Sequence, residues 1–284
     1  MDPLLLLQIS RPGLWLVFIW LYLWPSGGKI GLIEHSSFWL GVVYCTFPLN
    51  LLVYGMNDMV DCDTDKKNSR KGNYIFGAKA APSKLRKLPT IMYGLNCAFI
   101  ILFTILNWDL FYIWWLLAAF LVNAVYNWKP FALSRHAPWE VPCMIAGHFL
   151  IPLLSCQLNK LQYPGIGSWV FHALLLSRSH LWLEMMDINE DSSCGKRTIA
   201  VVLGGRLTLL LILLLTAAES WTAFYLLHSG LLGFFSVFGA ILLVTMHVAE
   251  SNGLSFDKKM VSITQSFIGV FLMLHVWQRG ELVS

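Results

Sequence analysis

Charged residues are scarce in this 284-residue sequence, and their scarcity excludes most soluble folds. Asp, Glu, Lys and Arg make up 13% of the chain, whereas hydrophobic residues make up 57%. A soluble domain has about a quarter of its residues charged, so a mean hydropathy of +0.62 indicates an integral membrane protein. The length suits one bundle of helices of about 20 residues each and leaves no room for a separate soluble domain.

Cysteine patterns that hold zinc or build a disulfide framework are also missing. The six cysteines include no Cys-x-x-Cys pair, and four of them fall within apolar stretches. Cysteine in such a setting behaves as a small hydrophobic residue, so we interpret these cysteines as packing residues.

Long apolar runs account for most of what is present. We expect nine spans, at 12–31, 37–56, 88–107, 109–126, 139–158, 168–186, 206–227, 230–249 and 259–278. The prediction is an all-α membrane protein, a single bundle of nine transmembrane helices with a central cavity. One domain would cover 1–284, as two four-helix halves (about 12–126 and 139–249) plus a ninth helix.

The basic residues are distributed unevenly about these spans. Sixteen of the twenty lie before the first span or in the loops after the second, fourth, sixth and eighth. Because cytoplasmic loops carry the excess of Lys and Arg, this distribution places those loops and the N-terminus in the cytoplasm.

Two acid-rich segments hold seven of the chain's sixteen acidic residues. The first extends from Asn57 to Asp65 and the second from Asp187 to Asp191, each at the cytoplasmic end of a predicted span. Carboxylates gathered in this way within a membrane protein are most simply explained by divalent cations that bind a polyanion.

The polar residues of both segments recur every three or four positions. The two series are Asn50, Tyr54, Asn57, Asp61 and Asp65, and His180, Glu184, Asp187 and Asp191. On a continuing helix each series shares one face, with Asp58 beside the first series and Asp63 on the opposite side. Like charges one turn apart repel, so cations are needed. Mg²⁺ is the natural candidate, because it takes few carboxylates and completes its shell with water and phosphate oxygens.

These segments resemble the paired signatures of the UbiA superfamily of intramembrane prenyltransferases. Asn57-Asp58-x-x-Asp61-x-x-x-Asp65 is similar to the first signature. Asp187-x-x-x-Asp191, followed by Gly195-Lys196-Arg197-Thr198 and Leu203-Gly204, is similar to the second. Arg11-Pro12 and Tyr126, ahead of a loop with Pro130, extend the resemblance over most of the chain. The stretch 63–72 looks closest to the lycopene-elongase-like branch, although Asn73-Tyr74 stand where many relatives have a second Arg-Pro pair.

The resemblance implies a Mg²⁺-dependent enzyme that ionises an allylic isoprenyl diphosphate and transfers the prenyl group to a lipophilic acceptor. The implied metal contacts are Asn57, Asp58, Asp61, Asp65, Asp187 and Asp191, and the implied catalytic residues are the same five aspartates with Tyr126. The implied substrate-binding residues are Tyr54, Asn57, Arg70, Lys71, Lys129, Arg135, Lys196 and Arg197. The site would open near the cytoplasmic face, under a polar cap formed by 57–87 and 187–205. The expected partners are donor, acceptor and lipid bilayer, with no nucleic acid.

Some of these residue types also have a structural explanation. Loop lysines orient membrane proteins, and interfacial belts explain most Trp and Tyr residues. Histidines within spans commonly form hydrogen bonds between helices, and this applies to His148, His172, His180 and His247. Arg178 and Glu184 are costly in lipid, so we expect both to face the cavity, either in a polar network or as substrate contacts.

Two other functions stay open. A terpene cyclase of the same superfamily would use the same residues, and the donor's own double bonds would capture the cation. A secondary transporter would bind cations near mid-bilayer, whereas these acids lie at helix ends.

Two other acidic motifs do not fit the sequence. A calcium loop is disfavoured because Lys66 and Gly72 stand where an EF-hand needs Gly and Glu. The Asp-Gly and Ala-Arg elements of CDP-alcohol phosphotransferases are missing between the acids.

Overall fold

The computed structural model describes residues 1–65, 71–251 and 258–283, and helices make up most of them. Within these residues, β-structure is limited to two isolated bridges, Asn73 with Gly77 and His136 with Arg197. The all-α prediction is therefore confirmed. The six cysteines are free thiols. Arg70, one of the predicted substrate-binding residues, lies outside the described residues.

Six helical stretches of the described chain are long and apolar enough to cross a membrane, judged by length and composition. They are Pro3–Ser26, Ser36–Val60, Pro82–Asn107, Glu140–Leu158, Ile199–Leu226 and Gly230–Ala249. Shorter apolar helical stretches, Phe111–Asn127 and Ile268–Gln278, overlap two further predicted spans. A helix at Ile166–Met186 covers the remaining one. The chain is thus a multi-pass integral membrane protein.

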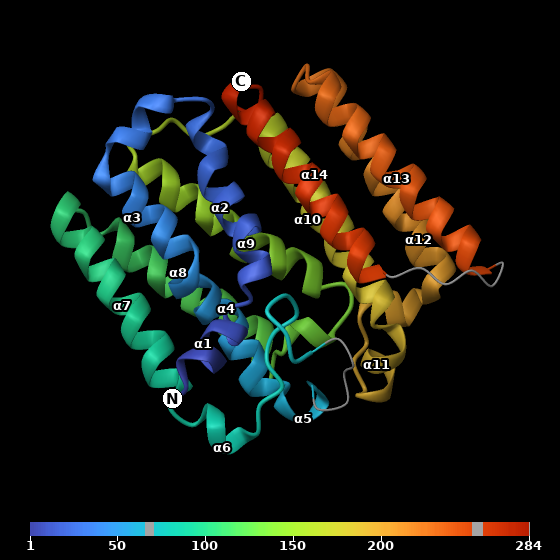
Figure 1. Ribbon diagram of the computed structural model, residues 1–284, viewed down its shortest axis with the longest axis horizontal. Helices are drawn as coiled ribbons and strands as arrows, with labels where there is room; N and C mark the ends of the chain where they lie inside the picture. The colour runs from blue at the N-terminus through green and yellow to red at the C-terminus, as the bar shows by residue number, and fades with distance from the viewer. Residues whose placement is uncertain (66–70, 252–257, 284) are drawn as a thin grey trace.

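The helices follow one another as shown in Figure 1. They are α1 (Pro3–Ile9), α2 (Trp15–Leu23), α3 (Ser36–Cys45), α4 (Phe47–Val60), α5 (Cys62–Asp65), α6 (Pro82–Leu85), α7 (Leu88–Asn107), α8 (Phe111–Asn127), α9 (Glu140–Leu158), α10 (Ile166–Met186), α11 (Ile188–Ser193), α12 (Ile199–Trp221), α13 (Gly230–Ser251) and α14 (Lys258–Gln278). The short helices α5, α6 and α11 gather at one end of the bundle, together with α1 (Figure 1).

Three predicted spans have different bounds in the structure, each for a local reason. The first begins at Pro3 and breaks at Arg11, which has a left-handed φ of 51° ahead of Pro12. The second breaks at Thr46, where the proline near the start of α4 cannot donate to the preceding turn. The seventh begins at 199 instead of 206, because the Thr198 hydroxyl caps α12 by accepting from the Val201 N–H.

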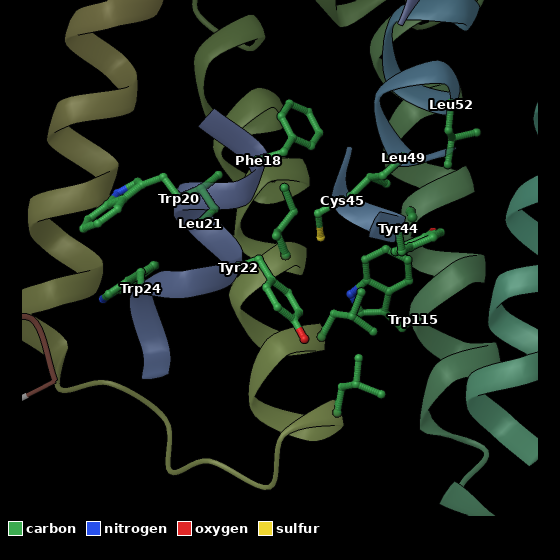
Figure 2. Packing of buried hydrophobic residues seen from close by; sticks show 14 of the residues in the cluster. Phe18, Trp20, Leu21, Tyr22, Trp24, Tyr44, Cys45, Leu49, Leu52 and Trp115 are labelled. Carbon is green, nitrogen blue, oxygen red and sulfur yellow. The ribbon is translucent and has the colours of Figure 1, made fainter. Parts of the chain in front are cut away.

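The helices pack as two neighbouring groups. On one side, α4 packs on α7, α7 on α8, α8 on α9 and α9 on α2; on the other, α12 lies between α10 and α13. Buried aromatic side chains fill the first group, and Figure 2 shows Tyr22 of α2 near Tyr44 and Trp115, with Phe18 farther along α2. This packed core supports one end of the cavity described next.

Candidate active site

The two acid-rich segments share one local structure. α4 and α10 each end one residue before an aspartate, Asp61 or Asp187, with φ/ψ of −96°/9° and −108°/8°. A short helix follows each break. In α5 the Asp65 N–H donates to the Asp61 carbonyl, and in α11 the Asp191 N–H donates to the Asp187 carbonyl, both at 2.8 Å. The expected continuous helix is therefore wrong at both aspartates, but the four-residue spacing is kept across each break.

Both polar series face a cavity of about 410 Å³. Its lining includes Tyr54, Asn57, Asp61 and Asp65 from the first series and His180, Glu184, Asp187 and Asp191 from the second. Asn50 is the exception. Its side chain is fully buried and donates to the carbonyls of Cys45 and Thr46 at the break between α3 and α4, where it satisfies backbone acceptors. The predicted shared face is thus confirmed for the residues that line the cavity.

Asp58 lies outside the cavity lining, where its carboxylate pairs with two basic side chains. Its Oδ1 is 2.7 Å from Arg11 Nη2 and 2.7 Å from Lys71 Nζ, and its side chain is 3% exposed. Lys71 also reaches Asp65 Oδ2 at 2.8 Å, so one ammonium group joins the two carboxylates. Both Lys71 and Arg11 line the cavity.

Arg11 has a position that spacing alone does not predict. Its guanidinium lies 4.3 Å from the centre of the Tyr54 ring and donates to Asn57 Oδ1 at 3.3 Å. Gly77, at φ 95°, makes this placement possible, because a Cβ there would lie 2.8 Å from Arg11 Nε. The sequence signal for Arg11 is its pairing with Pro12, which supported the family resemblance without assigning Arg11 a role.

Lys196 connects the two acid-rich segments. Its Nζ lies 3.4 Å from Asp61 Oδ2 and 3.1 Å from Asp191 Oδ1. Arg135 adds a second cation at Asp61, with Nη2 2.5 Å from Oδ1. Residues separated by more than a hundred positions in the chain therefore meet at one end of the cavity, as the sequence predicted for a shared polyanion site.

Burial and neighbouring charges shift the pKa values of Asp65, Asp191 and Lys196 in opposite directions. Burial raises the pKa of Asp65 and of Asp191, although the neighbouring Lys71 and Lys196 lower them. Burial lowers the pKa of Lys196, but the nearby Asp61 and Asp191 outweigh it, so this pKa is raised overall. Lys196 is therefore a firmly charged ammonium group at the mouth of an acidic site.

Of the remaining predicted site residues, one lines the cavity and two do not. Tyr126 lines the cavity. Lys129 and Arg197 are exposed and line no part of it, and Arg197 contributes through its backbone, which pairs with Arg135 and Ala137. Their proposed contact with substrate therefore has no support from this geometry.

Arg178 does not face the cavity, contrary to expectation. Its guanidinium makes a two-point contact with Glu219, Nε to Oε2 at 2.7 Å and Nη2 to Oε1 at 3.2 Å. Ser236 also donates to Glu219, at 2.6 Å. A buried acid on a neighbouring helix satisfies the arginine, and no property of Arg178 in the sequence indicates that partner. Glu184, in contrast, lines the cavity as expected.

Beyond its charged end the cavity is apolar. Phe18, Leu52, Trp115 and Ile151 are among the side chains of its wall. Two lining residues of this part, Val17 of α2 and Leu183 of α10, are 39% and 40% exposed. A ligand with a charged head and a long hydrocarbon tail matches this division.

The donor set at the charged end suits Mg²⁺. Asn57, Asp61, Asp65, Asp187 and Asp191 present hard oxygen atoms to the cavity, which Mg²⁺ prefers. In the described part of the chain, no three or more of the His, Cys, Asp and Glu side chains form a ready-made metal cage. That agrees with an ion that takes one or two carboxylates and completes its shell with water and phosphate.

Two curated relatives agree with the family resemblance of the sequence. The chain is 28% identical to a lycopene elongase/hydratase of Corynebacterium glutamicum over 176 residues, which cover 60% of this chain and 59% of that one. A second protein of that name and species is 28% identical over 180 residues, with the same coverage. The chain thus spans less than two thirds of the length of these relatives. Their name agrees with the branch predicted from the stretch after the first motif.

Solved structures show the fold. A UbiA homolog from Archaeoglobus fulgidus bound to dimethylallyl diphosphate (DMAPP) and Mg²⁺ superposes with a TM-score of 0.70 at 16% identity, over 98% of this chain and 99% of that one. The same type of homolog bound to geranyl diphosphate (GPP) and Mg²⁺ gives a TM-score of 0.64 at 16% identity, over 97% of each chain. The model of the UbiA prenyltransferase family matches residues 12–275, and this chain belongs to that family.

Proposed function

We propose that this protein is a Mg²⁺-dependent intramembrane prenyltransferase, which ionises an allylic isoprenyl diphosphate and transfers the prenyl group to a lipophilic acceptor. The observation that carries the proposal is the meeting of Asp61 and Asp191 at Lys196, at the charged end of an otherwise apolar cavity. A diphosphate head at that end and a prenyl tail beyond it would use both parts of the cavity.

The acidic residues divide into those that would bind Mg²⁺ and one, Asp58, that positions basic side chains. Asn57, Asp61 and Asp65 would hold Mg²⁺ at the first motif, and Asp187 and Asp191 would hold it at the second. When bound, Mg²⁺ supplies positive charge that neutralises the diphosphate and stabilises it as a leaving group. We assign Asp58 to positioning Arg11 and Lys71, because its side chain contacts both cations and lies outside the cavity lining.

Basic side chains at the cavity support the departing pyrophosphate. Lys71, Lys196 and Arg11 line the cavity, and Arg135 is held against Asp61. Each is paired with a carboxylate, which fixes its position before a polyanion arrives. Tyr126 lines the cavity, and we propose that its ring contacts the allylic part of the donor.

We propose a polyene hydrocarbon as the acceptor class. The support is the name of the curated relatives, lycopene elongase/hydratase, together with an apolar wall that offers few partners to a polar acceptor. An acceptor without polar groups would enter from the bilayer, past partly exposed lining residues such as Val17 and Leu183.

The proposed membrane arrangement has the acidic end of the cavity and the N-terminus on the cytoplasmic side. The support is the excess of Lys and Arg in the loops on that side. We also propose that the nine-helix bundle forms one domain of two four-helix halves and a ninth helix. The matching breaks at Asp61 and Asp187 support an internal repeat.

The test uses purified protein in detergent with Mg²⁺, DMAPP or GPP, and lycopene. Pyrophosphate release is measured beside the extracted products by mass spectrometry, with and without acceptor and with EDTA in place of Mg²⁺. Coupled product that requires both acceptor and Mg²⁺ supports the proposal. A cyclic product formed from donor alone would establish a terpene cyclase instead. Absence of pyrophosphate release with DMAPP, GPP and longer allylic diphosphates would rule out both enzymes.

A further inference from the structure

Prenyl transfer to a polyene requires a group that takes up a proton. The allylic cation forms its new carbon–carbon bond with an electron pair from an acceptor double bond, which leaves a cation on the acceptor. A neighbouring C–H bond then breaks, its electron pair forms a new double bond, and the proton leaves. Apolar side chains cannot accept that proton, so it passes either to the departing pyrophosphate or to a basic side chain of the cavity.

His180 is placed for this role by its position on α10. It lines the cavity seven residues before Asp187, which is roughly 10 Å of helix toward the apolar part. Its side chain is 19% exposed. It therefore stands between the charged end, where the donor would ionise, and the region where hydrocarbon would lie.

The hydrogen bonds of His180 differ from those of two other histidines within the spans. Nδ1 of His148 and Nδ1 of His172 each contact a carbonyl one turn earlier, at 2.8 and 2.9 Å. In the described part of the chain, no such bond holds Nδ1 of His180. The opposite nitrogen, Nε2, is buried and lies 3.2 Å from Glu184 Oε1, which is an ion-pair distance, although the two atoms are not aligned for a hydrogen bond. The nearby carboxylate favours a proton on Nε2, which leaves Nδ1 as the nitrogen able to accept a second proton.

Glu184 is held in place by α12. Its Oε2 accepts from the Ala200 N–H at 3.4 Å, and its side chain is 7% exposed. Glu140 accepts from the adjacent Ile199 N–H at 2.7 Å, so two buried carboxylates meet the first turn of that helix. A fixed negative charge beside Nε2 would stabilise the imidazolium that forms when Nδ1 takes a proton.

We propose that His180, oriented by Glu184, accepts at Nδ1 the proton that the acceptor loses after prenyl transfer. This role rests on the proposed function above, and it assigns the base to a side chain that lies outside the two aspartate motifs. The sequence alone favoured a hydrogen-bonding role for His180, because a histidine within a span commonly links helices. Its Nδ1, which makes no bond to a backbone carbonyl among the described residues, distinguishes it from His148, which also lines the cavity, and from His172, which does not.

The test separates ionisation of the donor from formation of product. His180→Gln keeps a polar side chain of similar length but has no basic nitrogen. Pyrophosphate release and coupled product are measured together with DMAPP, Mg²⁺ and lycopene. We expect the ratio of product to pyrophosphate to fall about 100-fold, the usual range for loss of a general base. Binding of Mg²⁺ and an unreactive thiodiphosphate analogue of DMAPP should stay within about twofold of the wild type, because the diphosphate site is intact.

Two further variants complete the design. His247→Gln is the matched control, because His247 lies on α13 and lines no part of the cavity, and it should match the wild type. Glu184→Gln keeps an oxygen for the Ala200 N–H and removes the charge, so it should lower the product ratio about tenfold or more. If His180→Gln fails to fold, Glu184→Gln still tests whether the contact between His180 and Glu184 is needed for product formation.

The outcomes are distinguishable. If wild-type protein forms product and both variants keep a product-to-pyrophosphate ratio within about twofold of it, the role of His180 is overturned while the proposed function stands. If the wild type forms no coupled product with any donor, the proposed function fails and the assignment of His180 fails with it. A lowered ratio with unchanged analogue binding supports the assignment, because a merely structural defect would weaken both.

Discussion

Lysine side chains at the site each contact two carboxylates. Lys71 lies between Asp58 and Asp65, and Lys196 between Asp61 and Asp191. Each ammonium group offsets repulsion between carboxylates that are brought together. A metal–diphosphate complex would supply cations to the same carboxylates and an anion to the same lysines, so both sets of charges keep partners when a ligand binds.

Asp61 lines the cavity and contacts both Arg135 and Lys196, so its charge can be tested directly. Asp61→Asn should weaken Mg²⁺-dependent donor binding and lower product formation roughly 100-fold or more, as expected when a group that stabilises developing charge is removed. Calorimetric titration with the DMAPP analogue and the product assay measure both effects. Asp2→Asn, at an exposed aspartate that caps α1, is the control and should behave as the wild type. Unchanged binding in Asp61→Asn would contradict the assignment.

The raised pKa of Asp191, caused mainly by burial, predicts a pH-dependent stability. Between the ordinary aspartate value of about 3.9 and the raised value, the folded chain binds more protons than the unfolded chain. This group therefore stabilises the fold as the pH falls through that window, and the contribution is lost as the pH rises again. Asp191→Asn lacks the contribution. Its stability relative to the wild type should fall between pH 7 and pH 4, measured by thermal unfolding without metal. A constant difference would contradict this prediction.

At the scale of helices, breaks determine where functional side chains lie. α12 contains a further break at Gly204, whose φ/ψ of 75°/165° belongs to a region that side chains with a Cβ rarely adopt. The break lies close to the start of α12, the helix whose first N–H groups meet Glu140 and Glu184. The glycine therefore lets the beginning of the helix take a different direction from its long apolar part.

Gly204 and its neighbour provide a matched pair of variants. Gly204→Ala should destabilise the protein by about 1–3 kcal/mol, because alanine is strained at that φ although no atom lies within 4 Å of the added Cβ. Gly205→Ala adds a Cβ at an ordinary 3.9 Å from Ile188 Cδ1 in regular helix, so it should be neutral or slightly stabilising. Unfolding in mixed micelles with increasing SDS compares them. Equal stability of the two variants would contradict the role of the break.

The sequence predicted the positions of the helices and the shared acidic site far better than the helix breaks and the ion-pair partners. Apolar length places a helix over each span, and the spacing of Asp61 and Asp65 places both at one cavity. The break at Asp61 was missed because polar periodicity continues through it. The pairing of Arg178 with Glu219 was missed because both lie in apolar helices and only their packing shows which faces meet. Arg11 was missed as a site residue because its contact with Asp58 crosses 47 positions of sequence.

The contact between Arg178 and Glu219 joins α10 to α12, and Ser236 extends it to α13. Glu219→Ala should destabilise the protein by about 3–5 kcal/mol, because a largely buried guanidinium loses its counter-charge. The double variant Arg178→Met/Glu219→Leu should recover most of this loss. SDS unfolding of the single and double variants measures the recovery. A double variant as unstable as Glu219→Ala would show that packing, and not charge, holds these helices together.

At the scale of the whole molecule, the proposed orientation can be tested by labelling. Ser193 is exposed in α11 near the acidic end, and Trp108, after α7, is 91% exposed. In a background with the six native cysteines replaced, Ser193→Cys should react with a membrane-impermeant maleimide only from the cytoplasmic side. Trp108→Cys should react only from the opposite side. The reverse pattern in sealed vesicles and inverted vesicles would overturn the proposed orientation.

Helices from the two ends of the chain are joined in the structure. Trp277 Nε1, in α14, donates to the Leu23 carbonyl at 3.0 Å and to Ser26 Oγ at 2.7 Å, and Trp24 Nε1 donates to the Leu282 carbonyl at 3.3 Å. During synthesis α2 enters the membrane long before α14 is made. The side of α2 that contacts α14 must therefore stay covered by lipid or by another protein until α14 arrives. Final closure of the bundle is thus a late step of biogenesis, and indole fluorescence from Trp24 and Trp277 would report it.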